Sequence, residues 1–87
     1  MNDRLQIQDT VREFIRKNFV FDPNTSFTDD ESLLGTGVID STGILELIGF
    51  LEEKYRLQFE DNELIGENFD TVQKITAFLS GKLAQQN

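Results

Sequence analysis

The sequence contains no cysteine, no histidine and no tryptophan, and only one proline. Without cysteine, the chain forms neither a disulfide nor a thiolate metal site. Without histidine, it lacks the usual general base for a serine nucleophile and all imidazole ligands. We therefore expect a non-catalytic protein with no bound structural metal.

Long apolar segments are absent as well. No apolar run approaches the roughly 20 residues of a membrane span. The N-terminal residues 1–4 show no apolar segment of the kind found in signal peptides. A length of 87 residues sets one domain as the upper limit. We expect a single domain over residues 1–87, monomeric and cytoplasmic.

The net charge is −8, and it is concentrated in one part of the chain. Residues 40–70 hold nine acidic and two basic residues, a net charge of −7, whereas residues 71–87 are net positive. This distribution argues against nucleic acid and anionic membranes as partners and favours a basic protein surface. An alternative is that the negative charge only keeps a small protein soluble.

Apolar residues at helical spacing predict three longer helices. They cover residues 3–19, 41–55 and about 71–84, the last capped by Asp70 or Thr71. The few strand signals and the short length favour an all-α four-helix bundle of three longer helices and one short helix.

Two connections join these helices. Residues 61–65 predict one or two helical turns that Gly66 ends as a C-cap. Residues 20–39 form a long first loop, which is unusual in a compact domain unless it packs onto the body. We expect four apolar side chains to anchor it: Phe21, Phe27, Leu33 and Leu34.

The segment from Gly37 to Gly43 reads Gly-Val-Ile-Asp-Ser-Thr-Gly and leads directly into the second helix. Asp40 and Ser41 both suit a helix N-terminus, because their side-chain oxygens can accept hydrogen bonds from first-turn amides. We expect Ser41 to be exposed there, at the positive end of the helix dipole, where an attached phosphate group would be stabilised.

This segment resembles the prosthetic-group site of the acyl carrier protein family, which includes peptidyl and D-alanyl carriers. The family pattern is a glycine-containing loop, an Asp-Ser pair and a helix with apolar and acidic residues. The chain departs from it after the serine, where many members have leucine or methionine. The matching residues are Asp40, Ser41, Glu46, Leu47, Leu51, Glu52 and Glu53, and the departing ones are Thr42 and Gly43.

The resemblance implies that Ser41 carries 4'-phosphopantetheine, transferred from coenzyme A by a phosphopantetheinyl transferase, with Asp40 as part of the cofactor site. The arm would shuttle thioester-bound acyl intermediates of fatty-acid, lipid or polyketide-type biosynthesis. Partners would be acyl-carrier synthetases or ligases, ketosynthases and acyltransferases with basic surfaces. Two alternatives stay open: an aminoacyl, peptidyl or D-alanyl carrier, and an unmodified acidic helical adaptor.

The outer face of the second helix is not built for stability alone. Gly49 costs about 1 kcal/mol relative to alanine in a helix interior, and acids near the C-terminal end oppose the dipole. These features favour a surface that docks on partner enzymes, although scattered exposed residues are also common on any helix. The expected partner-facing residues are Thr42, Leu45, Glu46, Gly49, Glu52 and Glu53.

Overall fold

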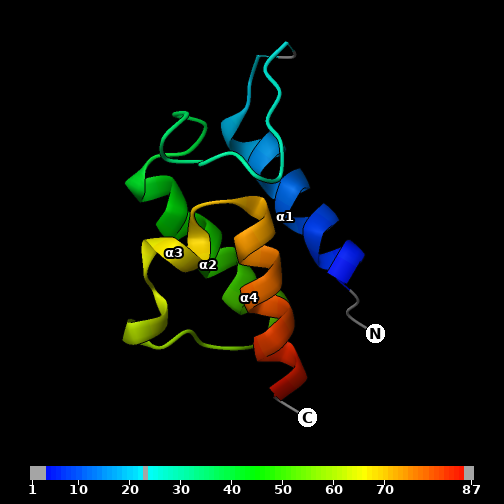
Figure 1. Cartoon of the computed structure of the whole chain (residues 1–87), viewed down its shortest axis with the longest axis vertical. Helices are drawn as coiled ribbons and strands as arrows, with labels where there is room; N and C mark the ends of the chain where they lie inside the picture. Colours follow the sequence, from blue (N-terminus) through cyan, green and yellow to red (C-terminus); the bar gives the residue numbers. More distant parts are fainter. Residues whose placement is uncertain (1–3, 23, 86–87) are drawn as a thin grey trace.

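The computed structural model describes residues 4–22 and 24–85, and these residues contain helices but no strand. The expected all-α architecture of three longer helices and a short one is confirmed (Figure 1). The predicted start of the first helix at Asp3 lies outside the described residues. The elements are α1 Arg4–Phe19, α2 Ser41–Tyr55, the 3-10 turn η1 Asp61–Glu63, α3 Gly66–Phe69 and α4 Val72–Gln85.

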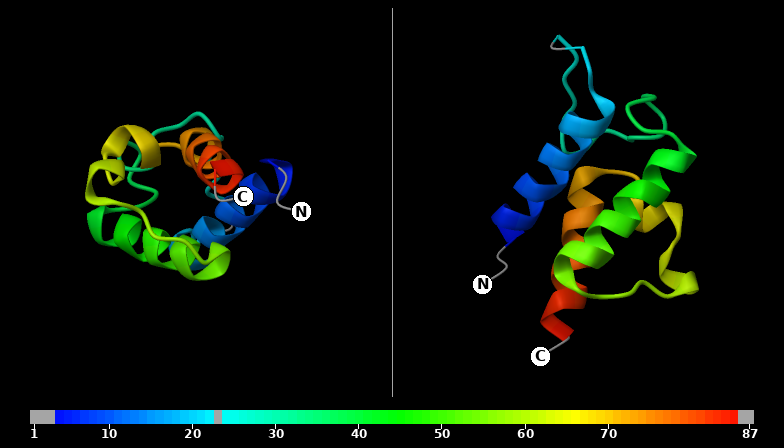
Figure 2. Two further views of the ribbon diagram at one scale, coloured as in Figure 1. Left: turned by 90° about the horizontal axis from the view of Figure 1, so that it is seen from below. Right: turned by 180° about the vertical axis from the view of Figure 1, so that it is seen from behind.

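The helices enclose one apolar core. Figure 2 shows α1 and α2 running in opposite directions, with α4 against α1 and α3 against α4. Each long helix buries the stripe that its sequence pattern predicts, and burial of these side chains is the main stabilising term of the fold. The fully buried side chains include Ile7, Val11 and Ile15 of α1, Leu47 and Leu51 of α2, and Ile75 and Leu79 of α4.

Aromatic pairs close the core on two sides. Phe59, Phe69 and Phe78 form one cluster, with ring centroids 5.4–5.8 Å apart. Phe14 of α1 stacks on Phe50 of α2 at 4.2 Å. The second pair joins two helices that make few other close contacts, so it helps to fix their spacing.

The short helix differs from its prediction. Residues 61–63 form the 3-10 turn η1, and α3 follows separately. Gly66 is the first residue of α3 rather than a C-cap, with Ile65 as the preceding N-cap residue. At the start of α4, the Thr71 hydroxyl accepts a hydrogen bond from the amide of Lys74 at 3.0 Å, so Thr71 is the cap.

The long first loop is fastened at two of its four expected anchors. Phe27 and Leu33 are buried, as predicted, but Phe21 is 82% exposed and Leu34 is 44% exposed. Polar contacts supply further fastening. Arg12 of α1 makes an ion pair with Asp29 at 2.6 Å, and its guanidinium lies 4.8 Å from the centre of the Phe27 ring.

Candidate functional site

Ser41 is the first residue of α2 and is exposed, as the sequence predicts. Asp40 has an extended backbone and caps the helix, because its Oδ1 accepts a hydrogen bond from the amide of Gly43 at 2.7 Å. The Asp40 carbonyl accepts a second bond, from the amide of Ile44 at 2.9 Å. The side chain of Asp40 therefore holds the turn that presents Ser41.

The amide groups of Ser41 and Thr42 remain unpaired. Neither makes a hydrogen bond to any other residue in the described part of the chain. Unpaired first-turn amides and the positive end of the helix dipole stabilise a phosphate group placed at this end. The residues at the start of α2 thus fit a phosphodiester on the Ser41 hydroxyl.

The loop that leads to Ser41 is held in place from α4. Gly37 has a φ of 79°, a conformation that favours glycine, and it turns the chain toward α2. Leu33 donates its amide to the carbonyl of Asp70 at 2.7 Å, and the Ser32 hydroxyl donates to the Asp70 carboxylate at 2.6 Å. Ile39 is buried and donates its amide to the Leu33 carbonyl. The position of Ser41 therefore depends on contacts between the long loop and Asp70 at the junction of α3 and α4.

Gly43 has a packing role that the sequence analysis missed. A Cβ atom at this position would lie 2.6 Å from Cγ1 of Ile39 and 2.9 Å from Cε1 of Phe19. Glycine in the first turn of α2 thus lets the end of α1 approach the start of α2. The sequence did contain a signal for this role, because glycine is a poor helix former and is unexpected in the first turn of a helix without a packing reason.

Five of the six expected partner-facing residues are exposed: Thr42, Leu45, Glu46, Gly49 and Glu53. Leu45 is 66% exposed and Gly49 has open space around its Cα. Glu52 is different, because it is only partly exposed and its Oε2 accepts a hydrogen bond from the amide of Phe59 at 2.9 Å. Glu52 therefore has a structural contact that was not expected, and its partner-facing role stays a prediction.

Among residues 4–22 and 24–85, no group of three or more acids is arranged to hold a metal ion. Among the acids of the described residues, Glu63 alone has a clear pKa shift, and it belongs to η1, which lies toward the opposite end of α2 (Figure 1). The hydrogen bond from Lys82 is the main cause that lowers the pKa of Glu63, and the amide of Glu60 adds to it.

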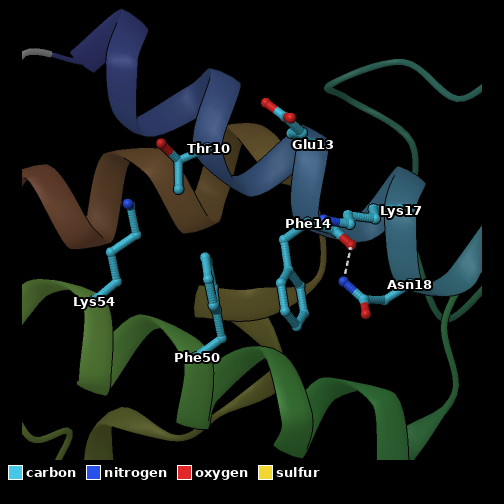
Figure 3. A pocket seen from close by; sticks show the side chains of 7 residues that line it. All are labelled: Thr10, Glu13, Phe14, Lys17, Asn18, Phe50 and Lys54. Carbon is cyan, nitrogen blue, oxygen red and sulfur yellow. Dashed lines mark hydrogen bonds between the residues drawn. The ribbon is translucent and has the colours of Figure 1, made fainter.

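Hollows lie along the seam between α1 and α2, one of them at the start of α2 and a larger one further along. The smaller, about 310 Å³, is here named the serine hollow, because residues on both sides of Ser41 line it. The larger, the aromatic groove of about 440 Å³, lies further along the seam (Figure 3). The stacked rings of Phe14 and Phe50 and the side chains of Lys17, Lys54 and Glu13 line the aromatic groove.

Within the described residues, no helix combines the length and apolar character needed to cross a membrane. The chain matches no family model. It is 32% identical over 71 residues to the D-alanyl carrier protein of Streptococcus suis (strain 98HAH33). It is 34% identical over 71 residues to the D-alanyl carrier proteins of Streptococcus pyogenes serotype M5 (strain Manfredo) and serotype M1. Each alignment covers 82% of this chain and 87% of the relative.

Proposed function

Because the chain belongs to the acyl carrier protein family, we propose that it bears a 4'-phosphopantetheine arm on Ser41 and carries an amino acid on that arm. The arm supplies a terminal thiol, which holds the cargo as a thioester. The observation that carries the proposal is an exposed Ser41 at the first position of α2, beside two unpaired amides.

The relatives support the aminoacyl alternative over a fatty-acid or polyketide cargo. Those relatives are named D-alanyl carrier proteins, and none of the three relatives described above is named for a fatty-acyl cargo. We therefore propose D-alanine, or another small amino acid, as the cargo. A ligase for that amino acid would load the thiol.

The chain's own residues would present and orient the serine rather than activate it. Asp40 fixes the helix turn through Gly43, and the amides of Ser41 and Thr42 would hold the phosphate oxygens. A serine nucleophile needs a positioned base, and the chain has no histidine to serve as one. The transferase would thus provide the chemistry of attachment, and this protein would act as its substrate.

The acidic outer face of α2 would guide partner enzymes to Ser41. Glu46 and Glu53 are exposed, and Leu45 next to Glu46 adds an exposed apolar side chain. Complementary charge raises the rate of encounter and sets the orientation of the partner. The transferase and the amino-acid ligase are accordingly expected to present arginine and lysine residues to this face.

Intact-mass spectrometry tests the attachment. The protein is incubated with coenzyme A, Mg²⁺ and a broad-specificity phosphopantetheinyl transferase. We expect the mass to increase by one phosphopantetheinyl group in the wild type and in Thr42→Ala, and not in Ser41→Ala. Thr42 is the matched control, since it carries a neighbouring exposed hydroxyl. An unchanged wild-type mass would overturn the proposal and favour the acidic adaptor.

Loading of the arm tests the cargo. The modified protein is given ATP, D-alanine and a D-alanyl carrier protein ligase, and a parallel sample receives a fatty acid with an acyl-carrier synthetase. We expect a hydroxylamine-sensitive mass increase of one alanyl group in the first sample. Loading with the fatty acid alone would keep the carrier role and reject the aminoacyl cargo.

A further inference from the structure

The serine hollow has apolar walls next to an exposed hydroxyl. Phe19 from the end of α1 and Phe21 and Val38 from the long loop provide the walls. Asp40 and Thr42 form the rim on either side of Ser41, and Glu46 lies one helical turn beyond Thr42. The hollow therefore combines apolar walls with two carboxylates, those of Asp40 and Glu46, and it starts beside Ser41.

Phe21 is the unexplained member of this group. Its side chain is 82% exposed although it lines the hollow, while the other expected anchors Phe27 and Leu33 are buried in the core. An exposed phenylalanine leaves a large apolar area in water, which further contacts could cover. Gly37 also lines the hollow, and no atom lies within 4 Å of the position that a Cβ would take there, so the backbone at Gly37 borders open space.

We propose that the serine hollow seats the first segment of this chain's own prosthetic arm, an inference that rests on the proposed function. The dimethyl-substituted carbon that follows the phosphate would pack against Phe21 and Val38. The hydroxyl and the first amide N–H of the arm are donors. The carboxylates of Glu46 and Asp40 line the hollow as acceptors, and Oδ1 of Asp40 already accepts from the amide of Gly43.

The covalent tether is the reason to assign this occupant. A group attached to Ser41 starts at the rim of the hollow, so its effective concentration there reaches the millimolar range or above. A shallow site of modest affinity is enough under these conditions. The aromatic groove is too far from Ser41 to seat the first segment of the arm. Phe50 lies nine residues further along α2, roughly 13 Å from Ser41 by helical rise.

Docking of the arm in the serine hollow would engage Glu46, which is also proposed to contact partner enzymes. Glu46 would accept from the arm in the free carrier and from partner side chains in the complex. The arm would then leave the hollow when an enzyme binds at Glu46. The serine hollow would thus be a resting place for the arm between partners.

NMR of isotope-labelled protein before and after modification tests the inference, with intact mass confirming attachment in each sample. We expect shift changes at Phe21, Val38 and Glu46, and nuclear Overhauser effects between the arm methyl groups and the Phe21 ring. Phe21→Ala is expected to accept the arm and to lose the contacts of its methyl groups with Val38. Leu5→Ala, an exposed apolar change on α1 outside both the hollow and the partner-facing residues, is expected to keep them.

Three results would overturn the inference. Complete modification with shift changes confined to Ser41 and Thr42 would show a free arm. Arm contacts at Phe14 or Phe50 would place the arm in the aromatic groove instead. Arm contacts to Val38 that persist in Phe21→Ala, together with slower loading by the ligase, would make Phe21 a partner contact. A wild-type mass that does not change would reject the proposed function itself.

Discussion

The Glu52 carboxylate near the end of α2 accepts a hydrogen bond from the backbone amide of Phe59, seven residues later. Between them, Arg56 ends the helix in a left-handed conformation with a φ of 54°, and its amide donates to the Glu52 carbonyl. The side chain and the carbonyl of Glu52 thus both fasten the exit from α2. Phe59 is buried at this point, so the bond also sets the position of a core side chain.

Glu52→Ala is therefore expected to lower the free energy of unfolding by about 1–2 kcal/mol, because the Phe59 amide loses a charged acceptor. Glu53→Ala is the matched control, since Glu53 is exposed and adjacent, and its change should stay within about 0.5 kcal/mol. Urea denaturation measures both. Equal stability of the two variants would contradict a structural role for Glu52.

Gly43 and Gly49 make opposite predictions for the same substitution. Gly43→Ala places a Cβ against Ile39 and Phe19, and overpacking should lower stability by about 1–3 kcal/mol. Gly49→Ala meets no atom within 4 Å in an exposed helix interior, and it should raise stability by up to about 1 kcal/mol. Thermal unfolding distinguishes them, and a stabilised Gly43→Ala would refute the proposed close packing.

The ion pair between Lys82 and Glu63, 2.8 Å long, predicts a pH-dependent contribution to stability. Because the pKa of Glu63 is lowered in the folded state, chiefly by Lys82, the contribution is fully present above the unfolded glutamate pKa of about 4.3. It is lost as the pH falls through the lower folded value. Wild type should be more stable than Lys82→Met at neutral pH, and the difference should shrink in acid.

Urea melts between pH 7 and pH 3 measure that difference. Lys74→Met serves as the control, because Lys74 lies on the same helix and is exposed. Its difference from wild type should vary less over this range. A gap for Lys82→Met that is constant down to pH 3 would show that the ion pair does not stabilise the fold.

Charge reversal on α2 tests the partner-facing surface. Glu46→Lys should lower kcat/KM of the transferase for the carrier by roughly fivefold, about 1 kcal/mol, as expected for an exposed ion pair. Glu13→Lys makes the same change in net charge on α1, where Glu13 is exposed, and it should have less effect. The wild-type rate should fall as salt rises, and less so for Glu46→Lys. Equal losses in both variants would indicate a general charge effect.

The sequence was sufficient for the features that depend on neighbouring residues. The apolar stripes predict α1, α2 and α4, and the Asp-Ser pair predicts the N-terminus of α2, because spacing and capping are local properties. The wrong prediction that Gly66 is a C-cap also came from the local pattern alone. A glycine after an apolar pair is a common C-cap, but α3 begins there and packs against α4.

The features that the sequence did not predict join residues far apart in the chain. Arg12 pairs with Asp29, Glu63 pairs with Lys82, and the Ser32 hydroxyl donates to Asp70 across 38 positions. Periodicity carries no information about such pairs. The role of Glu52 was missed for the same reason, since its acceptor function depends on how the chain returns after α2.

The contacts of Asp70 also set a condition for carrier engineering. The loop before Ser41 is fastened to the start of α4 through the backbone and the carboxylate of Asp70, and the Asp29 carbonyl accepts from the amide of Gln73. A graft that moves only the loop and α2 into another scaffold would leave these acceptors and donors behind. Transplanting Ser41 with its native orientation therefore requires residues 70–73, from the end of α3 into the first turn of α4, to travel with it.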